Sequence, residues 1–181
     1  EVGNLFHESI SRLLSKSEGV KLLETERSIT LINPNSEVII AGRLDDFILF
    51  ERTNEKIIVD VKTTKSLDYL DEPKKEHKMQ VMVYLKGLGI KKGGILYVKK
   101  DDFQIKYFEF DYEPSLLKEL MKKAELVHEC LVKGVPPDRV GLADRWQCDP
   151  RYCPYALECN EFEKNNTEAK NEINSTLLSN L

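Results

Sequence analysis

The sequence lacks the features that would place this chain in a membrane or outside a cell. Of its 181 residues, 41% are hydrophobic and 32% are charged. No apolar run approaches the roughly 18 residues that a bilayer span needs. Nothing at the start resembles a signal peptide, since Glu1 leads directly into a helical pattern. The formal net charge of −4 gives no overall field that attracts polyanions. The sequence therefore predicts an intracellular protein that does not contact a membrane.

Cysteine is scarce and unevenly placed. Only four cysteines occur, too few for the disulfide framework of a small secreted protein. Cys148, Cys153 and Cys159 form a C-x4-C-x5-C pattern, and thiolates at such spacing are typical ligands of zinc or of an iron–sulfur cluster. We therefore predict a structural metal site within residues 146–160. Cys130 is either a buried structural cysteine or a fourth ligand.

The periodicity of apolar residues predicts a single α/β domain over residues 1–164, followed by a polar tail over 165–181. The expected order is one helix, three strands, one helix, two strands and one helix. The helices are expected at 2–15, 74–89 and 115–134, and the strands at 27–32, 38–51, 57–64, 93–100 and 103–111. This order predicts a mixed central sheet flanked by helices.

Two carboxylates and a lysine stand out within the predicted strands. Asp60 and Lys62 are two residues apart and share one face of their strand, while Ile57, Val59 and Val61 occupy the other. Asp45 lies on the strand expected to pair antiparallel with it. Carboxylates that converge repel one another, and a hard divalent cation such as Mg²⁺ relieves that repulsion. We predict a cation site there, with the backbone carbonyl of Val61 as a further oxygen ligand. The alternative is that Asp60 and Lys62 are solvated strand residues.

Four short motifs follow one another along the chain. They are G-x-x-x-H (Gly3 and His7), G-x-x-D (Gly42 and Asp45), D-x-K (Asp60 and Lys62) and Q-x-x-x-Y (Gln80 and Tyr84). In this order the motifs resemble the PD-(D/E)XK nuclease superfamily, in its RecB-like branch. The resemblance covers about residues 1–160 and implies a restriction-endonuclease-like core.

The resemblance also implies a role for each motif residue. His7, Asp45 and Asp60 would hold Mg²⁺ or Mn²⁺, with Asp45, Asp60 and Lys62 acting in catalysis. Gln80 and Tyr84 lie one helical turn apart, so they share a face and would position Lys62 or the substrate. The alternatives are a helix-face histidine satisfied by a neighbour at His7 and a core tyrosine at Tyr84. Asp46 is expected on the opposite face of its strand and is assigned no catalytic role.

The cysteine segment is similar to that of iron–sulfur CRISPR-associated adaptation exonucleases and of virus-encoded relatives. This similarity implies a 4Fe–4S cluster on Cys148, Cys153 and Cys159, with zinc as the alternative metal. The sequence departs from that pattern because no cysteine precedes Gly3 and because the C-x4-C gap is wider. The fourth ligand is then expected either at Cys130 or in residues that precede Glu1.

These motifs lead to two hypotheses for function. The first is a metal-dependent DNA nuclease of a prokaryotic cell or its virus, an exonuclease or endonuclease acting on single-stranded DNA or on DNA ends. The second is a non-catalytic DNA-binding or assembly module with a structural metal. Homo-oligomers or nucleic-acid-processing partner proteins are expected with either. Candidate lysines for a DNA groove, which are otherwise part of a solvated charged face, are Lys65, Lys74, Lys75 and Lys78.

Overall fold

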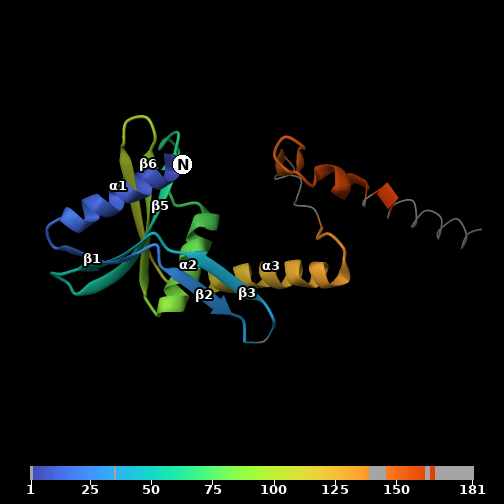
Figure 1. Ribbon diagram of the computed structural model, residues 1–181, viewed down its shortest axis with the longest axis horizontal. Coiled ribbons are helices and arrows are strands. Elements are labelled where there is room, and N and C mark those ends of the chain that lie inside the picture. Colours follow the sequence, from blue (N-terminus) through green and yellow to red (C-terminus); the bar gives the residue numbers. More distant parts are fainter. Residues whose placement is uncertain (1, 35, 139–145, 162–163, 166–181) are drawn as a thin grey trace, which may run out of the picture. The chain divides into compact units, whose positions relative to one another are not determined.

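The computed structural model describes residues 2–34, 36–138, 146–161 and 164–165 (Figure 1). The chain divides into two compact units, Glu1–Glu125 and Leu126–Leu181. Among the described residues, no helix combines the length and apolar character that crossing a bilayer requires. The expected division into 1–164 and 165–181 stays a prediction.

The first unit is built on a five-stranded sheet of order β1-β4-β5-β6-β7. Strands β5 and β6 are parallel and are joined by the crossover helix α2, while the other neighbours pair antiparallel. The helices and strands of the chain are α1 (Val2–Lys16), β1 (Val20–Thr25), β2 (Ser28–Ile32), β3 (Ile39–Arg43), β4 (Asp46–Phe50), β5 (Glu55–Thr64), α2 (Lys75–Leu88), β6 (Lys92–Lys99), β7 (Ile105–Asp111) and α3 (Pro114–Lys133), of which α3 includes residues of both units. The predicted mixed sheet with flanking helices is confirmed.

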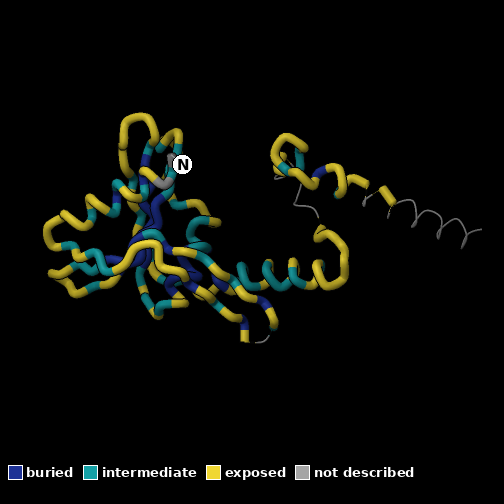
Figure 2. Tube along the Cα trace, in the orientation of Figure 1, coloured by how far each residue is buried: buried dark blue, intermediate teal, exposed yellow. Residues whose placement is uncertain are grey.

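Helices α1 and α2 cover opposite faces of this sheet, and each face has its own apolar cluster (Figure 1). Phe6 and Ile10 of α1 pack on Val59 and Val61 of β5, whereas Ile58 of β5 belongs to the cluster beneath α2. Figure 2 shows the buried residues concentrated along the central strands. Because both faces are covered, polar side chains of β5 lie inside the protein rather than on its surface.

The strand predicted over 38–51 is two strands in two sheets, so this prediction was wrong. Strand β3 pairs with β2 in a separate two-stranded sheet, and β4 enters the central sheet. The chain bends between them at Leu44 and Asp45. Strand β1 was not predicted, because a register irregularity between Leu22 and Glu24 interrupts the alternation of its side chains.

The second unit has little apolar interior among its described residues. Ala156 is its one buried side chain in that part of the chain. A short turn over 146–150 is held by the Asp149 N–H, which donates to the Trp146 carbonyl, and by two ion-paired contacts from Arg151 to Asp149 at 2.9 Å. The rings of Trp146 and Tyr152 meet edge to face, with centroids 5.7 Å apart.

Candidate active site

Strand β5 extends beyond the first residue of β4, and Asp45 lies beside the part of β5 that has no partner on β4. Strand β4 begins at Asp46, opposite Val59, while β5 runs on to Thr64. The N–H of Val61 therefore lies beyond the end of β4. It donates to Oδ2 of Asp45 at 2.7 Å. The aspartate of the second motif is thus fixed to the backbone between Asp60 and Lys62.

Asp60 is wholly buried on the α2 side of β5. Its Oδ2 lies 2.8 Å from Nζ of Lys62, and neither of its oxygens accepts a well-oriented hydrogen bond from the residues that the structure describes. Burial raises the pKa of Asp60 to about 6, although the charge of Lys62 acts in the opposite direction. A buried carboxylate with incomplete hydrogen bonding is costly, and such groups are concentrated at functional sites.

A hydrogen-bonded chain connects the lysine to helix α2. Lys62 Nζ donates to Oε1 of Gln80 at 2.9 Å, and Nε2 of Gln80 donates to the Tyr84 hydroxyl at 2.8 Å. The Tyr84 hydroxyl in turn donates to the backbone carbonyl of Arg43 at 3.0 Å. The D-x-K and Q-x-x-x-Y motifs are therefore joined by hydrogen bonds, and the Tyr84 hydroxyl connects them to the backbone of β3.

Gly42 is required by the ring of Tyr84. A Cβ at this position would lie 2.9 Å from Cε1 of that ring, closer than such contacts occur in proteins. The glycine of the G-x-x-D motif thus allows the tyrosine of the last motif to reach the Arg43 carbonyl. A Cβ at Gly3 would meet nothing within 4 Å, so the G-x-x-x-H glycine makes no comparable contact.

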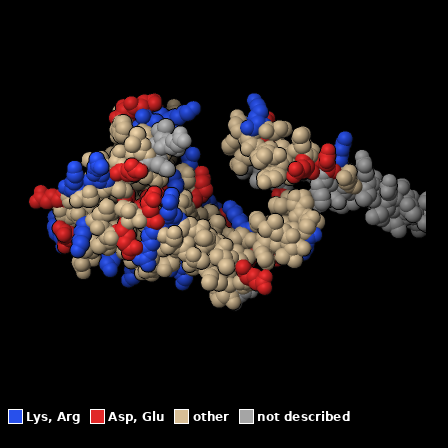
Figure 3. Space-filling model, in the orientation of Figure 1, with Lys and Arg blue, Asp and Glu red and all other residues tan. Residues whose placement is uncertain are grey.

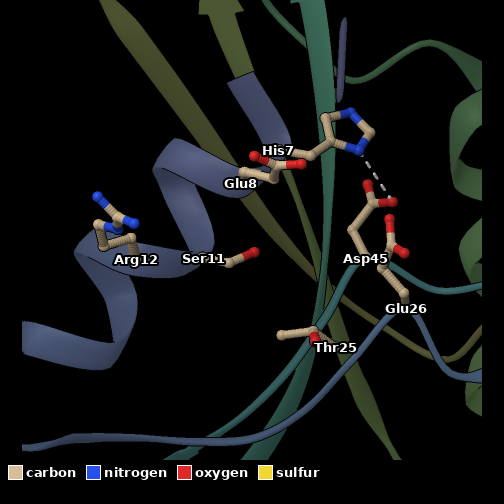
Figure 4. Close-up of a pocket in the computed structure, with 7 residues that line it drawn as sticks. All are labelled: His7, Glu8, Ser11, Arg12, Thr25, Glu26 and Asp45. Carbon is tan, nitrogen blue, oxygen red and sulfur yellow. Dashed lines mark ion pairs between the residues drawn. The ribbon is translucent and has the colours of Figure 1, made fainter. Parts of the chain in front are cut away.

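His7 projects from α1 toward Asp45, as Figure 4 shows, with Nδ1 at 3.3 Å from Oδ1. The two side chains border a cavity of about 370 Å³. Its other lining residues are Glu8, Ser11, Arg12, Thr25 and Glu26. A ligand in this cavity would therefore lie against the His7–Asp45 pair.

The predicted metal ligands form two neighbouring pairs rather than one cluster. Asp45 pairs with His7, and Asp60 pairs with Lys62. Within the described ranges, no group of three or more His, Cys, Asp or Glu side chains is arranged to hold a metal ion. Val61 reaches Asp45 through its N–H, and its carbonyl as a ligand stays a prediction.

Sequence reasoning gave no role to Asp46, yet it is wholly buried and contacts α1. Oγ of Ser11 donates to its Oδ1 at 2.6 Å, one helical turn beyond His7. Burial raises the pKa of Asp46 to about 6, although the Ser11 hydrogen bond lowers it. In the sequence, the four-residue spacing of His7 and Ser11 indicates that both lie on one face of the helix, and so that Ser11 faces the same strands as His7.

His77 was also missed. It lies one turn before Gln80 on α2, and its Nδ1 is 2.8 Å from the Tyr97 hydroxyl. Burial, and then the nearby charge of Lys62, lowers the pKa of His77. The spacing of His77, Gln80 and Tyr84 along one helix face was the signal that would have found it.

The candidate DNA-groove lysines differ in their surroundings. Lys75 pairs with Glu119 and Lys78 pairs with Glu113, so both are engaged by carboxylates. Figure 3 shows acidic and basic side chains interspersed on the visible face of the first unit. No continuous basic stripe covers that face, and the proposed groove stays a prediction.

The four cysteines lie within the second unit and are half-buried free thiols. The N–H of Cys153 donates to the Asp149 carbonyl, and that of Cys159 donates to the Tyr155 carbonyl. The described residues show no metal-binding group here either. The cluster, its metal and a role for Cys130 therefore stay predictions.

Comparisons with known proteins agree with this geometry. A family model described as the PD-(D/E)XK nuclease superfamily matches residues 1–160. The crystal structure of SSO0001 is similar with a TM-score of 0.57 and 24% identity, over 86% of this chain and 67% of that one. LHK-Exo in complex with dAMP is similar with a TM-score of 0.53 and 13% identity, over 72% and 66%. LHK-Exo is an alkaline exonuclease from Laribacter hongkongensis. No curated protein matches.

Proposed function

Because the chain belongs to the PD-(D/E)XK nuclease superfamily, we propose that it is a divalent-metal-dependent deoxyribonuclease. Its substrates would be single-stranded DNA or DNA ends, attacked as an exonuclease or an endonuclease. One observation carries the proposal. A buried carboxylate, Asp60, lies against Lys62, which Gln80 holds, beside the backbone N–H that fixes Asp45.

The donor atoms suit a hard cation. The carboxylates of Asp45 and Asp60 match the oxygen ligands that Mg²⁺ and Mn²⁺ take, and His7 would add an imidazole nitrogen beside them. Oδ1 of Asp60 is a buried oxygen that accepts no hydrogen bond within the described part of the chain. We assign these three side chains as its ligands. When bound, such a cation activates water and stabilises charge on a phosphoryl oxygen.

The remaining residues orient the reacting groups. Lys62 carries its ammonium group between Asp60 and Gln80, where it stabilises negative charge that develops on the phosphate. Gln80 and Tyr84 keep that ammonium in place through their hydrogen bonds to Lys62 and to the Arg43 carbonyl. These two are positioning residues, because they act through Lys62.

The test is cleavage of end-labelled single-stranded DNA with Mn²⁺ or Mg²⁺, compared with EDTA. We expect cleavage by the wild type with metal, none with EDTA, and a loss of at least about 1,000-fold in Lys62→Ala and Asp60→Asn because several kcal/mol of charge stabilisation disappear. Lys56→Ala is the matched control, since Lys56 is an exposed lysine on the same strand. Blunt duplex and circular substrates distinguish exonuclease from endonuclease action.

The opposite outcome is equally clear. If DNA binds but the wild type, Lys62→Ala and Asp60→Asn proteins all fail to cleave it with either metal, the chain is a DNA-binding module and the enzyme proposal is wrong. Intracellular location, oligomers and processing partners stay predictions that this assay does not address.

For the second unit we propose a structural metal bound by Cys148, Cys153 and Cys159, either a 4Fe–4S cluster or zinc. Support comes from the cysteine spacing and from the scarcity of buried side chains in its described part. Small segments without a core are commonly stabilised by metals. Anaerobic purification should give a brown protein with broad visible absorption for iron–sulfur, or a colourless protein with stoichiometric zinc. A colourless protein without bound metal would reject both.

A further inference from the structure

The turn between β6 and β7 carries a phenylalanine, Phe103, whose exposure and backbone conformation are both unfavourable for this residue type. Phe103 is 61% exposed and has a backbone φ of +60°. A bulky residue rarely adopts this left-handed conformation, where glycine or asparagine is usual. Exposure of the ring also forfeits the free energy that its burial would give. Residues that oppose such preferences are often placed for function.

The turn is held firmly. The N–H of Phe103 donates to the Lys99 carbonyl at 3.1 Å, and that of Lys99 donates to the Gln104 carbonyl at 2.8 Å. Asp102 adds an ion pair with Lys99 at 2.9 Å. The ring of Phe6 supports the Phe103 ring, with centroids 4.8 Å apart and planes inclined by 33°. The exposed ring is therefore fixed in place before any ligand arrives.

This turn lies beside the candidate active site. The N–H of Lys100 donates to the carbonyl of Thr64, two residues beyond Lys62 on β5. Phe6, which supports the ring, directly precedes His7 on α1. Strands β5 and β6 are parallel, and ligands of such strands bind beyond their carboxyl ends. Phe103 is at that end.

The neighbouring loop carries a second ring with the same two features. Tyr69 follows β5, is fully exposed and has a φ of +60°. Its loop approaches the sheet through Asp71, which lies 4.0 Å from Lys106 of β7. Positive and negative side chains are mixed here, so phosphate attraction is weak. The edge instead offers planar apolar surfaces.

Planar rings next to a site that cleaves a phosphodiester suit a nucleobase. Base–aromatic stacking is the usual means by which proteins bind single strands without reading sequence, and a base inside a duplex has no free face. Resting on the proposed function, we propose that Phe103 stacks on an unpaired base of DNA at the active site. Tyr69 offers a ring to a neighbouring base.

The experiment uses a short adenine oligonucleotide that contains 2-aminopurine, in EDTA so that nothing is cleaved. Stacking changes the fluorescence of this base analogue. We expect Phe103→Ala to weaken binding by about 5- to 150-fold, the factor that corresponds to ~1–3 kcal/mol per stacked base, and to lose the fluorescence change. Phe103→Trp keeps both. Tyr69→Ala has the same effect to a smaller degree, because no ring supports Tyr69 in the contacts of the described residues.

Two controls separate stacking from a structural role. Phe103→Leu keeps an apolar cover over Phe6 without a planar face, so it should behave as Phe103→Ala while circular dichroism shows an unchanged fold. Leu13→Ala removes a side chain of matched exposure, 62%, from the far part of α1 and should bind as the wild type does. The loss in Phe103→Ala should be equal at low and high salt, since stacking releases no counterions.

The inference is overturned if Phe103→Leu binds the oligonucleotide as tightly as the wild type, or if Phe103→Ala retains the fluorescence change. Such a result leaves cleavage by the wild type, and hence the proposed function, intact. Conversely, a wild type that never cleaves but shows Phe103-dependent fluorescence would reject the nuclease and retain the stacking site. Blunt duplex DNA should not discriminate among the variants.

Discussion

Each unit of the chain carries short motifs, the acidic and lysine motifs in the first and the cysteine motif in the second, but their side chains differ in how far the surrounding structure fixes them. In the first unit Asp45 and Lys62 are fixed by hydrogen bonds to Val61 and Gln80, between two apolar clusters. In the second unit the cysteines are half-buried, and Ala156 is the one buried side chain of its described residues. Packing positions the first set of residues in advance, whereas we propose that the second set depends on a bound metal for its order.

The largest expected effect follows from removing that ligand. Structural zinc contributes about 10–16 kcal/mol to the folding of zinc-finger peptides. We expect Cys153→Ser, or metal removal, to abolish protection from hydrogen exchange over residues 146–161 and to leave the first unit protected. Mass spectrometry of exchanged peptides measures both units in one sample. Equal protection with and without metal would contradict the contrast between them. Cys130→Ser, followed by metal analysis, tests the fourth ligand.

The second prediction concerns the free energy that burial of the Asp60 carboxylate costs the folded state. Burial raises the pKa of Asp60 from 3.8 to about 6, so ionised Asp60 destabilises the folded state by up to roughly 3 kcal/mol. Between these values the folded state binds more protons than the unfolded state. The contribution of Asp60 to the stability of the wild type therefore falls as the pH rises from about 4 to about 6, and it is constant above that range.

Asp60→Asn removes this cost together with the carboxylate that we propose to act in catalysis. We expect the variant to be more stable than the wild type at pH 7 and to lose that advantage toward pH 4, while it does not cleave DNA. Urea unfolding in EDTA at the two pH values measures the difference. Asp111→Asn, at an exposed carboxylate of β7, is the matched control. A variant that is less stable at pH 7 would show that Asp60 is well compensated.

The third effect tests packing around the site. Gly42→Ala puts a Cβ at 2.9 Å from the Tyr84 ring, and such overpacking costs typically ~1–3 kcal/mol. We expect lower stability and reduced cleavage, because displacement of Tyr84 releases Gln80 from its hydroxyl partner. Gly3→Ala, where a Cβ meets nothing within 4 Å, should leave cleavage unchanged. Thermal unfolding and initial rates measure both. Similar losses in the two variants would indicate a requirement that is unrelated to the Tyr84 contact.

The sequence contained much of this arrangement. Alternation in β5 placed Asp60 and Lys62 on one face and Val59 and Val61 on the other, as the structure confirms. A glycine within a strand often marks a close approach of another segment, and the ring of Tyr84 makes such an approach at Gly42. The inference about β5 succeeded because it depends only on the local alternation of side chains.

The features of the site that the sequence did not predict depend on which sheet each strand joins. The bend at Leu44 and Asp45 separates β3 from β4, and alternation carried across a bend no longer reports which face a side chain occupies. The placement of Asp46 on the face opposite Asp45 therefore gave no indication that Ser11 contacts it. The carboxylate of Asp45 accepts a hydrogen bond from the N–H of Val61, which has no partner residue on β4 because β4 begins at Asp46. No pattern in the sequence indicates this contact.

The smallest effect is expected at the end of the hydrogen-bonded chain. Tyr84→Phe removes one hydroxyl that joins Gln80 to the Arg43 carbonyl, and such a bond contributes about 1 kcal/mol. The ring stays, so packing against Gly42 is unchanged. We expect kcat to fall by about tenfold or less with KM unchanged, because Gln80 then holds Lys62 less firmly. Tyr155→Phe, at an exposed tyrosine of the second unit, is the control for cleavage. An unchanged kcat would mean that helix α2 alone positions Gln80, and the first unit would then owe less of its order to hydrogen bonds than to packing.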